Sequence, residues 1–93
     1  MSAYIVVELT LKDPEALGRY RTDVAPTLKR FGGEPLAGTP WQVLHGEAAY
    51  ETGTILGFPD REAALAWYNS PEYQALGPVR DTAFNSRFRL VGL

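Results

Sequence analysis

Residues 3–9 predict a strand that is apolar on both of its faces. The segment is rich in β-branched residues and carries a single charge, as buried strands do. Side chains of a strand alternate between its faces, and here Tyr4 and Val6 form one set while Ile5 and Val7 form the other. An antiparallel strand with one solvated face would show a polar set. We therefore expect protein to cover both faces of this strand.

Residues 13–33 carry the signals of one long helix. Asp13 can cap the free amides and Pro14 suits the first helical position. Apolar residues then recur at spacings of three and four as far as the glycine pair at 32–33, which ends the helix. Pro26 lies inside this stretch, and we expect a kink there rather than a break, because the apolar stripe continues in phase beyond it.

Shorter helical signals follow. Asp60 is predicted to cap a helix over residues 63–68, and Ser70, followed by proline, to start a separate short helix over residues 72–76. Residues 79–84 predict one more helical turn.

Three further segments have strand patterns. Residues 41–46 alternate well enough for a second main strand, residues 54–58 are apolar or small on both faces, and residues 87–91 alternate charge with apolar side chains as an edge strand does. Residues 34–37 predict a short extended piece.

The resulting order of elements is strand, helix, strand, strand, helix, strand. It predicts an α+β domain of the ferredoxin-like βαββαβ type, a four-stranded antiparallel sheet with helices on one face and the first and third strands at its centre. The chain has 93 residues, so we expect residues 1–93 to form this single domain. The simplest cover for the other face of the sheet is a second copy of the chain. We therefore expect a homodimer that pairs sheet to sheet.

Composition excludes several classes of function. The net charge is −2, which disfavours nucleic acid as a partner, and the absence of cysteine rules out disulfides, thiolate metal sites and cysteine nucleophiles. Apolar runs are far shorter than the roughly 20 residues that cross a bilayer, and the N-terminus shows no basic leader. We expect a cytoplasmic protein with no metal, no cofactor and no membrane partner.

One stretch of the chain reads Trp67-Tyr68-Asn69-Ser70-Pro71-Glu72-Tyr73, with Arg80 a short way beyond it. Together with Asp13-Pro14 and Phe58-Pro59, this run resembles the signature of the bacterial domain-of-unknown-function family 1330, and the likeness extends over essentially the whole chain. The resemblance implies a ferredoxin-like domain that pairs through its sheets into a dimeric α/β barrel, with no established activity. Members often carry an acid where this chain has His45.

His45 is the only histidine, and its side chain ordinarily titrates near neutral pH, so it is the best candidate for a catalytic proton-transfer group. On an edge strand near a loop it also fits the role of a polar surface or interface residue. A lone histidine gives no support to a metal site, because most metal sites need several ligands.

Trp67, Tyr68 and Tyr73 lie around a predicted helix break, where rings with polar tips can line a pocket for a planar small molecule. In a small domain, however, rings between a helix and a sheet usually form the core, and that is the stronger interpretation of these three. Arg80 is a candidate cation for a carboxylate ligand, or a tie between this segment and a neighbouring acid. The candidate ligand-binding residues are therefore His45, Trp67, Tyr68, Tyr73 and Arg80.

Glu8 shares a strand face with Tyr4 and Val6, where a carboxylate needs a partner. Arg87 and Arg89, on the predicted neighbouring edge strand, are the expected partners of an ion pair near the dimer interface.

Three functions fit these features. The first is a homodimeric protein that binds a small organic molecule, with no settled catalysis. The second is a cofactor-independent enzyme, monooxygenase-like or isomerase-like, in which His45 moves a proton. The third is a dimerisation module.

Overall fold

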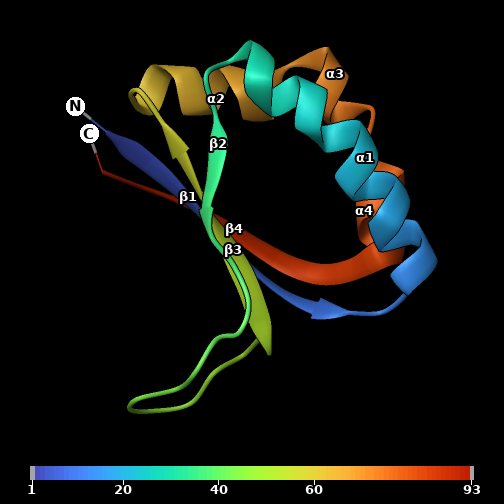
Figure 1. Cartoon of the computed structure of the whole chain (residues 1–93), viewed down its shortest axis with the longest axis vertical. Helices are drawn as coiled ribbons and strands as arrows, with labels where there is room; N and C mark the ends of the chain where they lie inside the picture. Colours follow the sequence, from blue (N-terminus) through green and yellow to red (C-terminus); the bar gives the residue numbers. More distant parts are fainter. Residues whose placement is uncertain (1, 93) are drawn as a thin grey trace.

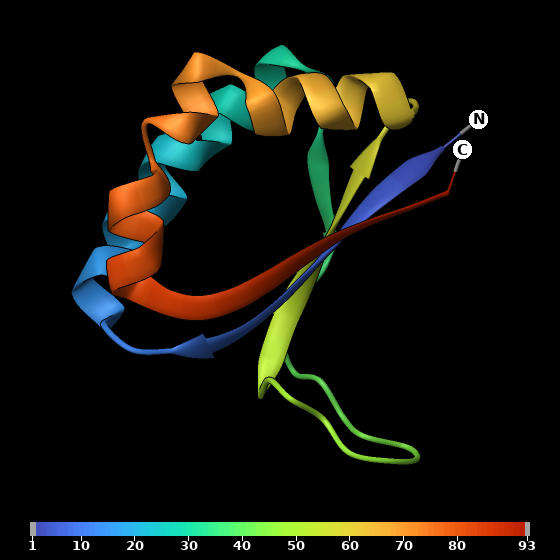
Figure 2. The ribbon, with the colours of Figure 1, turned by 180° about the vertical axis from the view of Figure 1, so that it is seen from behind.

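The structure is a computed structural model that describes residues 2–92. It has two layers, an antiparallel sheet and an arc of helices over one of its faces (Figure 1). The view from behind shows the same arc and places the two ends of the chain next to each other (Figure 2). The strands are β1 (Ala3–Leu11), β2 (Glu34–Ala37), β3 (Thr52–Phe58) and β4 (Phe84–Gly92), and the helices are α1 (Pro14–Arg30), α2 (Arg61–Asn69), α3 (Pro71–Gln74) and α4 (Gly77–Ala83).

The strands lie in the order β2-β3-β1-β4, so the first and third strands are central, as the sequence predicts. β1 pairs with β4 along its whole length, from Ala3 opposite Gly92 to Leu11 opposite Phe84. It pairs with β3 on its other side. β1 therefore lies in the middle of the sheet. The helices cover only one of its two faces.

The predicted helix starts are confirmed. The carboxylate of Asp13 accepts hydrogen bonds from the backbone amides of Glu15 (3.0 Å) and Ala16 (3.3 Å) at the start of α1. Asp60 caps α2 and Ser70 caps α3 in the same way. α1 continues through Pro26 without a break.

The predicted strand over residues 41–46 is wrong. These residues belong to a loop that projects from the body of the molecule (Figures 1 and 2). The second strand of the sheet is β2, which pairs with β3 only as far as Ala37 and has an irregularity between Pro35 and Ala37. The Gly-Thr-Pro turn that follows takes the chain off the sheet edge, so the alternating residues beyond it have no strand to pair with.

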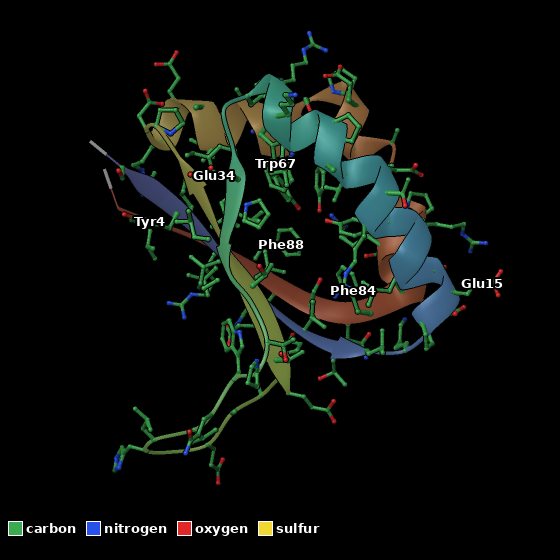
Figure 3. All side chains as sticks on the ribbon, in the orientation of Figure 1. Tyr4, Glu15, Glu34, Trp67, Phe84 and Phe88 are labelled. Carbon is green, nitrogen blue, oxygen red and sulfur yellow. The ribbon has the colours of Figure 1, made fainter. Side chains whose placement is uncertain are left out.

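The core lies between the helices and the sheet. Its largest fully buried side chains are Trp67 and Tyr73. Trp67, Phe84 and Phe88 point into the space between the two layers (Figure 3). None of the helices within residues 2–92 has the length and apolar character needed to cross a membrane.

Candidate functional site

Three of the predicted site residues form one cluster of rings. The ring centroids of Trp67 and Tyr73 are 4.2 Å apart, and those of Tyr68 and Tyr73 are 5.5 Å apart. Trp67 and Tyr73 are fully buried, whereas Tyr68 is half-buried. The indole Nε1 of Trp67 donates to Thr27 Oγ1 at 3.0 Å. Trp67 and Tyr73 are therefore core residues, and Tyr68 is the ring of the three that solvent reaches.

Arg80 is held in place at the edge of this cluster. Its Nη1 donates to the hydroxyl of Tyr73 (3.4 Å), and its Nε donates to Asp81 Oδ1 (3.1 Å). The guanidinium carbon lies 5.9 Å from the ring centroid of Tyr73 and 5.7 Å from that of Phe88, within the range of cation–π attraction. The Arg80 side chain is 19% exposed, so a well-positioned cation remains within reach of a ligand.

The hydrogen bonds of Arg80 extend to a second tyrosine. The hydroxyls of Tyr73 and Tyr20 are 2.8 Å apart in the core. Burial raises the pKa of Tyr20 far above its ordinary value, and the neighbouring Tyr73 raises it further. Burial also raises the pKa of Tyr73. Burial alone would lower the pKa of Arg80, but its hydrogen bonds to Tyr73 and Asp81 outweigh this and raise it. Both phenols are neutral and the guanidinium is charged across the physiological range.

A cleft of about 580 Å³ opens beside Arg80, at the β4 edge of the sheet; we call it the arginine cleft. Its lining combines aromatic and aliphatic side chains from β4 and α2 with three cations and a single acid. The residues that line it are Ile5, Lys12, Ala64, Leu65, Tyr68, Arg80, Asp81, Phe84, Asn85, Ser86, Phe88, Arg89 and Leu90. A chain with net charge −2 thus places a local excess of positive charge around one cleft.

A second cleft, of about 880 Å³, lies between α1 and the β2 side of the sheet; we call it the apolar cleft. Most of its wall is aliphatic, from β1, β3 and α1. The hydroxyl-bearing residues of this wall are Tyr20, Thr39, Thr52 and Thr54. The charged residues of the lining, all of them exposed, are Arg21, Lys29 and Glu34.

The two clefts lie on opposite sides of one aromatic wall. Phe84 lines both of them, Tyr20 lines the apolar cleft, and Arg80 lines the arginine cleft. Tyr73 lies between, hydrogen-bonded to Tyr20 on one side and to Arg80 on the other. The ring of Tyr20 meets Phe84 edge to face at 5.2 Å.

His45 is not near the other candidates in the described structure. It lies in the projecting loop between β2 and β3, not on an edge strand, and it lines neither cleft. Its neighbour Leu44 is 90% exposed. Within one copy of the chain, the structure therefore brings together Trp67, Tyr68, Tyr73 and Arg80, but leaves His45 apart.

The expected partner of Glu8 is confirmed as Arg87. Arg87 donates to both carboxylate oxygens of Glu8, at 2.9 to 3.1 Å. The pair spans β1 and β4, where the two residues are direct neighbours in register. It lies on the face of the sheet that the helices leave open, and a bidentate geometry of this kind fixes both side chains.

Several residues of the clefts were not singled out from the sequence. Tyr20 belongs to the apolar stripe of α1, a pattern that predicts core rather than site. Lys12 lies in the turn after β1, and Thr52 lies just before the predicted third strand. These three residues line a cleft because of the way the chain folds, and no sequence motif marks them. Within residues 2–92, histidine, aspartate and glutamate side chains form no group of three that suits a metal ion.

Three solved structures that match nearly the whole chain share little sequence with it. A protein of unknown function from Rhodopseudomonas palustris is 20% identical, with a TM-score of 0.77 over 97% of this chain and 80% of that one. SnoaB, a cofactor-independent oxygenase from Streptomyces nogalater, is 14% identical, with a TM-score of 0.71 over 99% and 92%. A dimeric ferredoxin-like protein of unknown function from Jannaschia sp. CCS1 is 18% identical, with a TM-score of 0.66 over the full length of both chains. The chain has the ferredoxin-like fold.

Among curated proteins, none matches the chain. The model of a family described as a domain of unknown function, DUF1330, matches residues 2–92. That match confirms the resemblance seen in the sequence, and this chain belongs to the DUF1330 family.

Proposed function

We propose that this protein is a homodimer that binds a small aromatic carboxylate in the arginine cleft. The observation that carries the proposal is the fixed guanidinium of Arg80, which is partly buried beside the rings of Tyr73 and Phe88 and lines the cleft. Tyr68 lines the same cleft and is the second ligand contact. Trp67 and Tyr73 support these two residues from behind.

Arg80 keeps donors for a ligand. Its Nε and Nη1 donate to Asp81 and Tyr73, and within residues 2–92 no side chain accepts from its Nη2. A guanidinium presents its donors in a planar fork that matches a carboxylate. Lys12 and Arg89 line the same cleft and add to its positive potential.

The apolar part of the ligand would lie against Tyr68, Phe88 and the aliphatic side chains Leu65 and Leu90. Flat aromatic rings bury well against such a wall and gain from edge-to-face or offset contacts. The cleft volume of about 580 Å³ lies in the range of small-molecule sites. Benzoate is the simplest probe with both features.

The homodimer is supported by the open face of the sheet. By register, Tyr4, Val6 and Ile55 point to the face opposite the helices. Val91, on β4, is 42% exposed. Dimeric proteins of this fold are known from Jannaschia sp. CCS1 and Thermobifida fusca. A second copy laid sheet to sheet would remove these side chains from water. We further propose the bacterial cytoplasm as the location of the dimer, as expected from the sequence.

The test is an NMR titration of the protein with benzoate and with benzamide, its neutral counterpart. We expect benzoate to shift the amide signals of β4 and α4, and benzamide to bind about tenfold more weakly or not at all. Arg80→Gln should remove this preference, while Arg80→Lys should retain part of it. Arg19→Gln, which changes an exposed charge on α1 instead, should leave the preference unchanged.

Three results would count against the proposal. They are equal binding of benzoate and benzamide, unchanged binding by an Arg80→Gln variant that keeps its thermal midpoint, and shifts confined to residues outside the arginine cleft. Loss of binding in Arg80→Gln counts for it only if the variant remains folded, because Arg80 also holds Tyr73.

A cofactor-independent enzyme is the second candidate, favoured by the likeness of fold to SnoaB over 99% of this chain. His45 remains the proton-transfer group of this hypothesis. Because its loop projects from the body of its own chain, His45 would reach a ligand only in the assembled dimer. The NMR samples test this: time-dependent conversion of the bound ligand that His45→Ala abolishes supports the enzyme, and a ligand that stays unchanged supports binding alone.

A further inference from the structure

The projecting loop, residues 38–51, holds apolar side chains away from the body of its own chain. Trp41 is 37% exposed, Val43 is 55% exposed and Leu44 is 90% exposed. The loop extends beyond the end of the sheet, where the rest of the chain does not cover it (Figures 1 and 2). Removal of such side chains from water is favourable. The loop therefore presents an apolar surface to another molecule.

This loop also contains a segment with the pattern of a strand. Residues 41–46 alternate as a strand does, but among the described residues no strand pairs with them. The pairing of β2 with β3 ends earlier, at Ala37. A segment of this length is long enough to pair along the edge of a sheet. What it lacks within its own chain is a free edge.

The β4 side of the sheet is a free edge. β4 is nine residues long, and among the described residues only β1 pairs with it. In an antiparallel pair, every second residue directs its backbone N–H and C=O groups away from the partner strand, so β4 has a row of such groups on its outer side. Most residues of β4 between Phe84 and Leu90 also line the arginine cleft. A strand added at this edge would therefore close the cleft on that side.

The charges of the loop and of the β4 edge are complementary. The loop contains Glu47 and Glu51 and neither lysine nor arginine. The arginine cleft has a single acid against three cations, which are Lys12, Arg80 and Arg89. Opposite potentials favour association of the loop with this edge, whereas two acidic loops repel each other.

A two-fold axis along the strands would bring these two surfaces together in the homodimer proposed above. Such a rotation reverses the lateral order of the strands, so the β2 edge of one copy lies opposite the β4 edge of the other. The rotation also preserves strand direction. Within one chain β2 and β4 run in opposite directions, because the three pairings that connect them are all antiparallel. A segment that continues β2 therefore runs antiparallel to β4 of the second copy, the more stable kind of pairing.

The loop also begins at the right height along the strands. A Cβ atom at Gly53 would lie 2.9 Å from Trp41 Cζ2, so Trp41 is level with Gly53. In the register of the sheet, Gly53 is opposite Glu8, and Glu8 is opposite Arg87. Rotation about an axis along the strands leaves this height unchanged. Trp41 of one copy thus meets β4 of the other near Arg87, and the residues after Trp41 run toward Phe84.

We propose that residues 41–46 of one copy add a strand to the β4 edge of a second copy and close the arginine cleft of that copy. By symmetry, each copy gives one strand and receives one. The inference rests on the proposed homodimer and specifies how its two copies interlock. It gives a structural role to the alternation of a segment that is a loop within its own chain. It also brings His45 of one copy to the start of β4 in the other, next to the arginine cleft.

Introduced cysteines test the contact directly, because the chain has no cysteine of its own. The register above places Val43 of one copy opposite Asn85 of the other, and opposite residues of paired strands are close enough for a disulfide. Chains with Val43→Cys and chains with Asn85→Cys are co-expressed and oxidised, and mass spectrometry should find a disulfide that joins the two kinds of chain. The control is Val43→Cys with Glu15→Cys, an exposed position on α1, and these chains should stay largely unlinked.

Proline substitutions test the backbone pairing. Val43→Pro and Leu44→Pro each remove one backbone N–H, and because alternate residues face the partner strand, one of the two N–H groups belongs to the added pairing. We expect that variant to raise the dissociation constant of the dimer about tenfold and to weaken benzoate binding about fivefold. Ala48→Pro, in the same loop but outside the added strand, should change neither. All three variants should keep the circular dichroism of the wild type, because they alter only the exposed loop.

The outcomes separate this inference from the function on which it rests. Absence of the mixed disulfide, or wild-type dissociation constants in both Val43→Pro and Leu44→Pro, would overturn the added strand; if Ile55→Asp on the open face still separates the copies, the homodimer stands without it. A wild-type monomer would refute the homodimer and the added strand together. A mixed disulfide in a protein that does not bind benzoate would support the added strand and contradict the ligand proposed for the arginine cleft.

Discussion

The two faces of the sheet differ in how their apolar side chains are covered. On the face toward the helices, Ile5, Val7 and Leu56 are buried within the chain. On the opposite face, Tyr4 and Val6 are only half-buried. The same strands supply both sets, so the difference comes from the second layer: the chain supplies one for the first face and little for the other.

The open face is covered only in part, by side chains of β2 and of the loop that follows it. A Cβ atom at Gly57 would lie 2.6 Å from Leu36 Cδ1, and one at Gly53 would lie 2.9 Å from Trp41 Cζ2. The two glycines therefore allow Leu36 and Trp41 to lie against the sheet. Leu36 is still 50% exposed. This partial cover fits the proposed homodimer, in which a second copy would complete it.

The largest effect is expected on the helix-covered face. Trp67→Ala should lower the free energy of unfolding by about 3–5 kcal/mol, because it empties a fully buried site and removes the hydrogen bond to Thr27. Urea unfolding followed by circular dichroism measures this. The control is Leu65→Ala on the same helix, where the side chain is 47% exposed and the loss should stay below about 1 kcal/mol. Equal losses in the two variants would mean that Trp67 is not the centre of the core.

On the open face, the expected effect is on assembly rather than on folding. Wild-type protein should sediment with twice the mass of one chain at micromolar concentration. Ile55→Asp should sediment as one chain with its circular dichroism retained, because a charge in the centre of the sheet cannot be covered by a second copy. Leu65→Asp, on the helical side, should leave the mass unchanged. A wild-type monomer, or a dimer of Ile55→Asp, would contradict the sheet-to-sheet homodimer.

The helix starts and the central strands could be predicted from the sequence, because local sequence features determine both. Caps such as Asp13, Asp60 and Ser70 act locally, so the helix starts were predicted correctly. The two-faced pattern of residues 3–9 and 54–58 identified the central strands, because only a central strand needs apolar residues on both sides.

Residues 41–46 show why an alternating sequence pattern alone does not establish a strand. Their alternation is that of a strand, but a strand also needs a neighbour, and the pairing of this part of the chain with β3 ends at Ala37. Whether a partner is present is a property of the whole sheet and cannot be seen in six residues. His45 was placed wrongly for the same reason.

The site was predictable only in part. Arg80 and the ring residues stood out as a cluster in sequence, and the fold does bring them together. Tyr20 and Thr52 come from distant segments, and neither belongs to a motif.

The smallest of the three effects is expected in alkali, and it again separates the two faces, because Tyr20 and Tyr73 both lie on the helix-covered side. Burial raises the pKa of both phenols in the folded state, whereas an unfolded tyrosine ionises near about pH 10. Above that pH the unfolded chain releases protons that the folded chain retains. Stability is therefore full below about pH 10 and falls as the pH rises toward the folded values.

We expect Tyr20 to account for a loss of about 1 kcal/mol in the free energy of unfolding between about pH 9 and pH 11, and Tyr73 to change it in the same direction. Tyr20→Phe keeps the ring against Phe84 and removes the titrating group, so its loss over this interval should be smaller than that of the wild type by about that amount. Leu28→Ala loosens the same core without removing a phenol, and it should keep the wild-type slope although it is less stable at every pH. Urea unfolding at the two pH values gives both slopes. Equal losses of stability in Tyr20→Phe and the wild type would mean that the hydroxyl of Tyr20 ionises as easily in the folded chain as in water, and would contradict the effect of its burial between Tyr73 and Phe84.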